Sequence, residues 1–140
     1  MDSKKILALD QKLSAQRNEW SNIIRGLAAG LKDLNGMEEV IANVLSSRQT
    51  LVDQMAYINV KVKQQKKVIA ARYRTAYIRY YNYDYKLGEK QKEKFLEDDL
   101  ADDNMILSHL ENQMDWTRDS IKTLDNMGFA IRNRLAIKDL

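Results

Sequence analysis

The chain has 140 residues and a net charge of +3, from 23 Lys and Arg against 20 Asp and Glu. It contains one histidine and no cysteine, and the absence of cysteine excludes disulfides and cysteine-based zinc or redox sites. It also contains no proline, the residue that most strongly breaks a helix. Its length predicts one domain with one modest core. No apolar run suits a membrane span or a secretory signal, so we expect a cytoplasmic protein.

The first predicted element, residues 1–35, is an amphipathic helix. Its apolar residues recur every seven positions, which is typical of helices that pack in coiled-coil fashion. Gly26 and Gly30 either weaken this helix or allow a close approach to another. The residues of the seven-residue repeat are Ile6, Leu13, Trp20, Leu27 and Leu34.

The second element, residues 36–86, is a long basic and aromatic helix. Asn35 and Glu38 have the spacing of a capping box, which predicts a helix start there. Apolar residues then follow at steps of three and four, and the stripe continues through Tyr73 to Tyr80. One helix from about Met37 to about Tyr81 would be roughly 65 Å long, so we expect a kink or a coiled-coil arm.

The remainder divides into two parts. Residues 87–104 are predicted to be a hydrophilic acidic connector, either a loop or a weakly helical bridge, with several candidate N-caps. Residues 105–140 are predicted to be a C-terminal amphipathic helix and a short tail. Gly128 suits the C-cap of that helix, with Phe129 making the accompanying apolar contact.

The predicted fold class is therefore all-α: long amphipathic helices with heptad stripes, forming a helical bundle or a coiled-coil oligomer. The stripes of the first and last helices exceed what an elongated monomer would cover, so we expect homo-oligomers. The predicted oligomerisation residues are Ile106, Leu110, Met114, Ile121, Leu124 and Phe129.

Charge is distributed unevenly along the chain. Residues 54–83 contain seven basic residues and no acidic one, whereas acids predominate in residues 95–119. On a helical wheel, Lys61, Arg72 and Arg79 lie on one flank of an aromatic stripe, and Lys63, Lys67, Arg74 and Tyr81 lie on the other. Cations bind phosphates and tyrosines stack on unpaired bases. The predicted DNA-binding residues are Lys63, Lys66, Lys67, Arg72, Arg74, Tyr77, Arg79 and Tyr81.

The same stretch has a simpler interpretation. An aromatic stripe that continues an apolar one is usually core, which we expect for Tyr73 and Tyr80, and the basic flanks are then merely solvated. Tyr81, Tyr83 and Tyr85 lie off the stripe or beyond it and suit stacking better.

Motifs for other chemistry are absent from the sequence. No phosphate-binding or dinucleotide-binding glycine motif occurs. The acids from Glu97 to Asp103 have no calcium-loop spacing and suit helix capping or pairing with the basic helix. His109 is expected at a surface or an interface. We predict no enzymatic activity, no cofactor and no metal.

Residues 60–135 resemble the UvsY family of bacteriophage recombination mediators. The likeness rests on "KKVIAARYRTAYIRYYNYDYK", with Arg72, Arg74 and Tyr77 as its core, then "FLEDDLADDN" and the closing segment "DNMGFAIRNRL". The resemblance implies a helical, ring-forming oligomer that binds single-stranded DNA in recombination and repair. It further implies that the protein loads a RecA-like recombinase onto DNA covered by single-strand-binding protein, contacting both proteins in the infected bacterial cell.

Two alternatives remain from the residues alone. One is a coiled-coil structural or assembly protein, for example a virion component, in which the basic helix pairs with the acidic segment of a neighbour and no nucleic acid is bound. The other is a regulatory adaptor that wraps a partner through an exposed apolar stripe.

Overall fold

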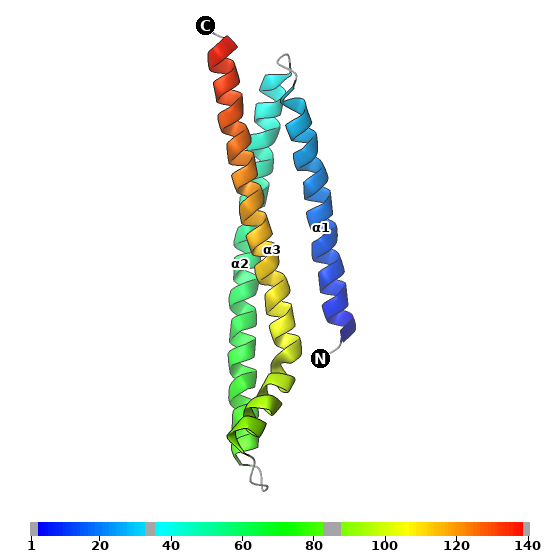
Figure 1. Ribbon diagram of the computed structural model, residues 1–140, viewed down its shortest axis with the longest axis vertical. Coiled ribbons are helices and arrows are strands. Elements are labelled where there is room, and N and C mark those ends of the chain that lie inside the picture. Colours follow the sequence, from blue (N-terminus) through cyan, green and yellow to red (C-terminus); the bar gives the residue numbers. More distant parts are fainter. Residues whose placement is uncertain (1–2, 33–35, 83–87, 139–140) are drawn as a thin grey trace.

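The computed structural model describes residues 3–32, 36–82 and 88–138, which form three α-helices (Figure 1). They are α1 (Ser3–Gly30), α2 (Met37–Tyr81) and α3 (Glu89–Lys138). Helices α2 and α3 form a long antiparallel hairpin, and α1 lies beside part of it. The all-α prediction is confirmed, and α2 has the bounds that its apolar stripe predicts.

The larger core cluster lies where α2 begins and α3 ends. Leu51 and Leu124 are almost fully buried there, and α1 contributes Trp20 and Leu27 to the edge of the cluster. The seven-residue repeat of α1 therefore packs against the hairpin. At the end of α1, an added Cβ on Gly30 would lie 3.1 Å from a methyl carbon of Val40, so the glycine allows a close approach between α1 and α2.

A second cluster, formed by Ile58, Val62 and Leu110, lies farther along the hairpin. Polar side chains are also buried on α3 beside α1: Arg17 donates a hydrogen bond of 2.8 Å to the amide oxygen of Gln113, which is 3% exposed. Beyond the start of α1, the hairpin continues as α2 and α3 alone (Figure 1). We call this part, residues 63–82 and 88–104, the tip.

Of the two alternatives for the connector at residues 87–104, the described part is helical, because α3 already begins at Glu89. Leu96 and Leu100, four residues apart, are both 7% exposed and pack toward α2. One apolar residue in each of two successive turns is enough to bury one side of this hydrophilic segment and hold it as helix. The predicted N-cap Asn35 lies outside the described residues, and α2 follows Gly36, which makes no side-chain cap.

The predicted helix end at Gly128 is also wrong, because α3 continues to Lys138. No described glycine has a positive φ, so Gly128 is an ordinary helical residue. A glycine inside a helix costs about 1 kcal/mol relative to alanine. Burial of Ile131, which is 2% exposed, contributes about 2 kcal/mol and offsets that cost.

The predicted oligomerisation residues are mostly used inside the chain. Leu110 and Leu124 are buried, and Ile106, Met114 and Ile121 pack against the two clusters. Phe129 is 57% exposed and remains available to another molecule. One chain thus covers most of its own stripes, because α1, α2 and α3 pack on one another.

We expect Leu51→Ala to lower the free energy of unfolding by about 3 kcal/mol, since it removes a buried side chain and leaves a cavity. Val60→Ala is the control: Val60 is 51% exposed on the same helix, and its loss should cost less than about 1 kcal/mol. Urea unfolding followed by circular dichroism measures both. Equal losses in the two variants would contradict this core.

Candidate nucleic-acid interface

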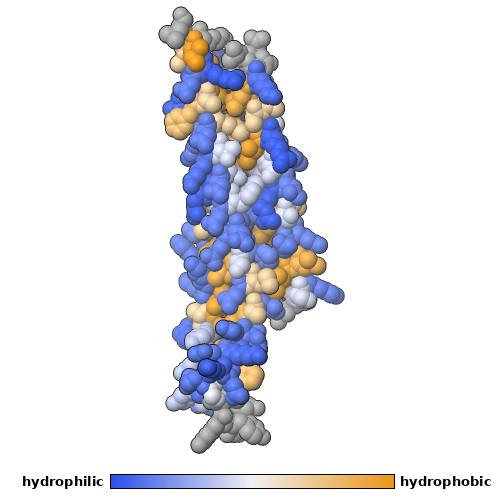
Figure 2. All heavy atoms as spheres, viewed as in Figure 1, coloured by the Kyte–Doolittle hydropathy of each residue, from blue (hydrophilic) through white to orange (hydrophobic). Residues whose placement is uncertain are grey.

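The predicted DNA-binding residues lie on the last third of α2, at the tip. On the face shown in Figure 2, hydrophilic side chains predominate at this end of the molecule, whereas apolar side chains are visible toward the opposite end and around the start of α1. The buried Ala76 and Leu100 lie between α2 and α3 here. This contact separates the basic residues of α2 into two flanks with different surroundings.

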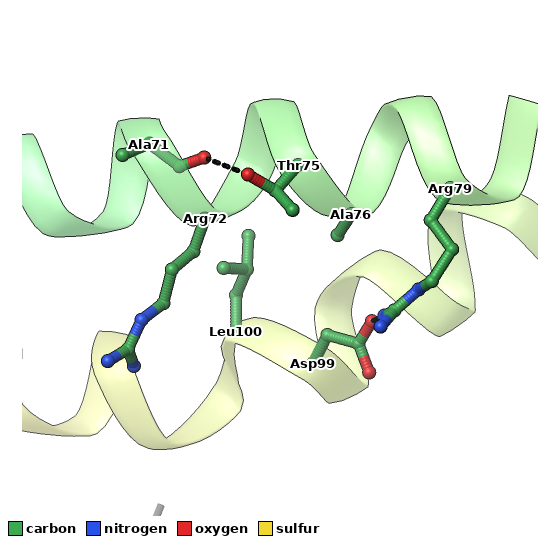
Figure 3. Close-up of a pocket in the computed structure, with 7 residues that line it drawn as sticks. All are labelled: Ala71, Arg72, Thr75, Ala76, Arg79, Asp99 and Leu100. Carbon is green, nitrogen blue, oxygen red and sulfur yellow. Dashed lines mark hydrogen bonds and ion pairs between the residues drawn. The ribbon is translucent and has the colours of Figure 1, made fainter.

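On one flank, Arg72 is paired with an acid of α3. Its Nη1 lies 2.6 and 2.7 Å from the two carboxylate oxygens of Asp103, which is 1% exposed. Gln65 donates a further hydrogen bond, 2.9 Å long, to the backbone oxygen of Asp103. Figure 3 shows Arg72 reaching from α2 toward α3, with Leu100 pointing up beside it. The guanidinium thus compensates a buried carboxylate.

Arg79 is paired in the same way one step farther along. Its Nη2 lies 2.5 Å from a carboxylate oxygen of Asp99. Figure 3 shows these two side chains pointing toward one another between α2 and α3. Tyr80 donates a 2.7 Å hydrogen bond to the same carboxylate, and this bond, together with burial, raises the pKa of the Tyr80 phenol. The Tyr80 ring stacks on Phe95 with 5.4 Å between centroids.

Arg72 and Arg79, both predicted to bind DNA, are therefore paired with acids of the same chain. Two carboxylates of α3, four residues apart, neutralise two arginines of α2. The sequence suggested that these acids pair with the basic helix. It did not show that the acids and the arginines lie on the two helices of one hairpin in the same chain. A signal was present in the spacing, since Asp99 and Asp103 share one side of a helix, as do Arg72 and Arg79.

The other flank of α2 stays open. Its four cations are exposed, and within the described residues no carboxylate lies at ion-pair distance from any of them. We call this surface the open basic face; it consists of Lys63, Lys66, Lys67 and Arg74.

Beside the open basic face, three tyrosines form a row that we call the tyrosine ladder. Tyr73, Tyr77 and Tyr81 are 46%, 47% and 68% exposed. Each neighbouring pair of rings stacks with 6.1 Å between centroids and 19° between planes. The prediction that Tyr73 belongs to the core is wrong, whereas Tyr80 is half-buried. Tyr83 and Tyr85 lie outside the described residues.

Helix α3 borders the ladder on the side away from the open basic face. Tyr73 lines a shallow groove together with Glu93 and Glu97 of α3. Farther along, Lys92 places its Nζ 5.6 Å from the centroid of the Tyr81 ring. The two glutamates repel a polyanion. The charged backbone of a polyanion would therefore lie along the open basic face, close to the lysines and Arg74.

The described residues offer little for other chemistry. Among them, no group of three or more His, Asp or Glu side chains is arranged to hold a metal ion. His109 is partly buried where α1 meets α3, with its Nδ1 3.6 Å from Asp10. No described helix has the length and apolar character needed to cross a membrane.

Comparison with known proteins finds no matching family model, no matching curated protein and no matching solved structure. The geometry of the tip is therefore the evidence from which a function is inferred.

We expect Asp103→Ala to lower the free energy of unfolding by about 2 kcal/mol, because it removes two charge-assisted hydrogen bonds at a buried site. Asp98→Ala is the matched control, since Asp98 is an exposed acid on the same helix and should change stability by less than about 0.5 kcal/mol. Urea titration measures the difference. If both variants lose equally little, the ion pair does not hold the tip together.

Proposed function

We propose that this protein is a non-enzymatic single-stranded DNA-binding protein whose contact surface is the open basic face with the tyrosine ladder beside it. One observation carries the proposal: four exposed cations without a carboxylate partner run along the same helix as three exposed, regularly spaced aromatic rings. Cations that follow a phosphate backbone and rings that stack on unpaired bases are the two parts of a single-strand surface.

The resemblance to phage recombination mediators extends this proposal to a biological role. Of the three residues at the core of that likeness, Arg74 and Tyr77 are exposed, whereas Arg72 is held by Asp103. We propose that the protein helps a RecA-like recombinase replace single-strand-binding protein on DNA, with Arg74 and Tyr77 contacting the strand and Arg72 positioning the helix.

The open basic face is small, so the proposed binding depends on repetition. Four phosphate contacts predict a plot of log affinity against log salt concentration with a slope of about −3. Several copies on one strand multiply such weak contacts through effective concentration. This is the reason that self-assembly belongs with the proposed function.

We expect Arg74→Gln to flatten the salt slope by about 0.7, because one phosphate contact and its released counterion are lost. Anisotropy of labelled poly-dT, titrated at several salt concentrations, measures the slope. Lys122→Gln is the control: it removes the same charge from an exposed position of α3 far from the tip, and should leave the slope unchanged.

Lys67→Gln should reproduce the effect of Arg74→Gln, since Lys67 belongs to the same face. Equal slopes for wild type, Arg74→Gln and Lys67→Gln would place the DNA elsewhere. If the wild-type protein does not bind poly-dT even at low salt concentration, the proposed function is wrong.

A second candidate function, an assembly protein, is favoured by the other end of the molecule. Leu45, Phe129 and Ile137 are 61%, 57% and 69% exposed there. Leu45 also lines an apolar groove between α2 and α3 that includes Ile41 and Leu135. Exposed apolar side chains around a groove are typical of a surface that another protein covers, and we propose a second copy of the chain as that protein.

We expect Phe129→Glu to reduce the mass of the protein in solution, because it replaces an exposed apolar side chain of this end with a carboxylate, which opposes burial. Light scattering coupled to gel filtration measures the mass. Ser108→Glu, at an exposed position of α3 away from the groove, is the control. A wild-type protein that is already monomeric at high concentration contradicts self-assembly, whatever its affinity for DNA.

A further inference from the structure

The spacing of the tyrosine ladder carries a further inference. Residues four apart on an α-helix are separated by about 6 Å along its axis. The rings of Tyr73, Tyr77 and Tyr81 follow this rise, with 6.1 Å between successive centroids and planes inclined by only 19°. Nearly half or more of each tyrosine is exposed, so the space beside each pair of rings opens to the surface.

We propose that unpaired bases insert between successive rings of the ladder, one base between Tyr73 and Tyr77 and one between Tyr77 and Tyr81. This inference rests on the proposed function and deepens it, because it names the base, rather than the phosphate alone, as the group recognised. Stacked planes lie about 3.4 Å apart, so a ring, a base and a second ring need about 6.8 Å. The ring centroids are 6.1 Å apart, so the rings must separate by at least about 0.7 Å, through rotations of exposed side chains.

The charges around the ladder orient the strand. The phosphates are attracted to Lys67 and Arg74 on one side, whereas Glu93 and Glu97 repel them on the other. A strand that keeps its backbone over the open basic face turns its bases toward the ladder. At the far end, the ammonium of Lys92 lies over the Tyr81 ring and ends the row of rings.

This arrangement selects single strands. In a duplex, successive bases are already stacked and paired, and separating them by the thickness of a ring costs unstacking energy at each step. An unpaired strand avoids most of that cost. The contact uses only the flat faces of the bases, so it predicts little preference among base sequences.

The experiment compares oligo-dT with an abasic deoxyribose-phosphate polymer of the same length and charge. Tyr77 contributes to both gaps, and it is the residue to vary. We expect Tyr77→Leu to weaken binding of oligo-dT roughly five- to a hundredfold, to leave binding of the abasic polymer unchanged, and to keep the salt slope of wild type. Tyr77→Phe keeps the ring and should bind oligo-dT as wild type does.

Tyr57→Leu is the matched control, because Tyr57 is 64% exposed on the same helix but lies outside the ladder. Circular dichroism melting confirms that each variant folds. If wild type binds oligo-dT and the abasic polymer equally, or if Tyr77→Leu weakens both alike, base insertion is wrong while single-strand binding stands. If wild type binds neither polymer, the proposed function fails and this inference fails with it.

Discussion

The packing of α2 against α3 at the tip is the constraint on which the candidate site depends. Ala76 is buried between the helices opposite Leu100, and a small residue at that position lets them approach closely. The pairing of Arg72 with the buried Asp103 then fixes the rotation of α2 about its own axis. A buried carboxylate without its cation is strongly unfavourable, so this rotation is specified and not merely permitted.

That rotation decides which charges remain for a partner. It turns Arg72 and Arg79 toward the acids of α3, and it leaves the open basic face and the tyrosine ladder at the surface. The net charge of +3 gives no hint of this division. One flank of α2 is thus neutralised within the chain and the other is left open, and Arg72 and Arg79 contribute to the packing of α2 against α3.

Much of the fold follows from periodicity, and much of the site does not. Apolar steps of three and four were sufficient to predict α2 from Met37 to Tyr81, because a long stripe leaves no other regular structure. The sequence did not decide between loop and helix after Glu89, because charged residues there outweigh Leu96 and Leu100, and burial of those two leucines depends on a partner helix. The exposure of Tyr73 was missed for the same reason: a wheel shows which residues share a face, but the position of α3 determines which face is covered.

The ladder has a geometric consequence for the path of a bound strand. Rows of residues four apart do not run parallel to a helix axis but are inclined to it by about 26°. A strand threaded along Tyr73, Tyr77 and Tyr81 would therefore run at a shallow angle to α2, closer to parallel with the long axis of the hairpin than across it. Such a strand would pass along the rod-like body made by α1 and the rest of the hairpin and would diverge from it only gradually.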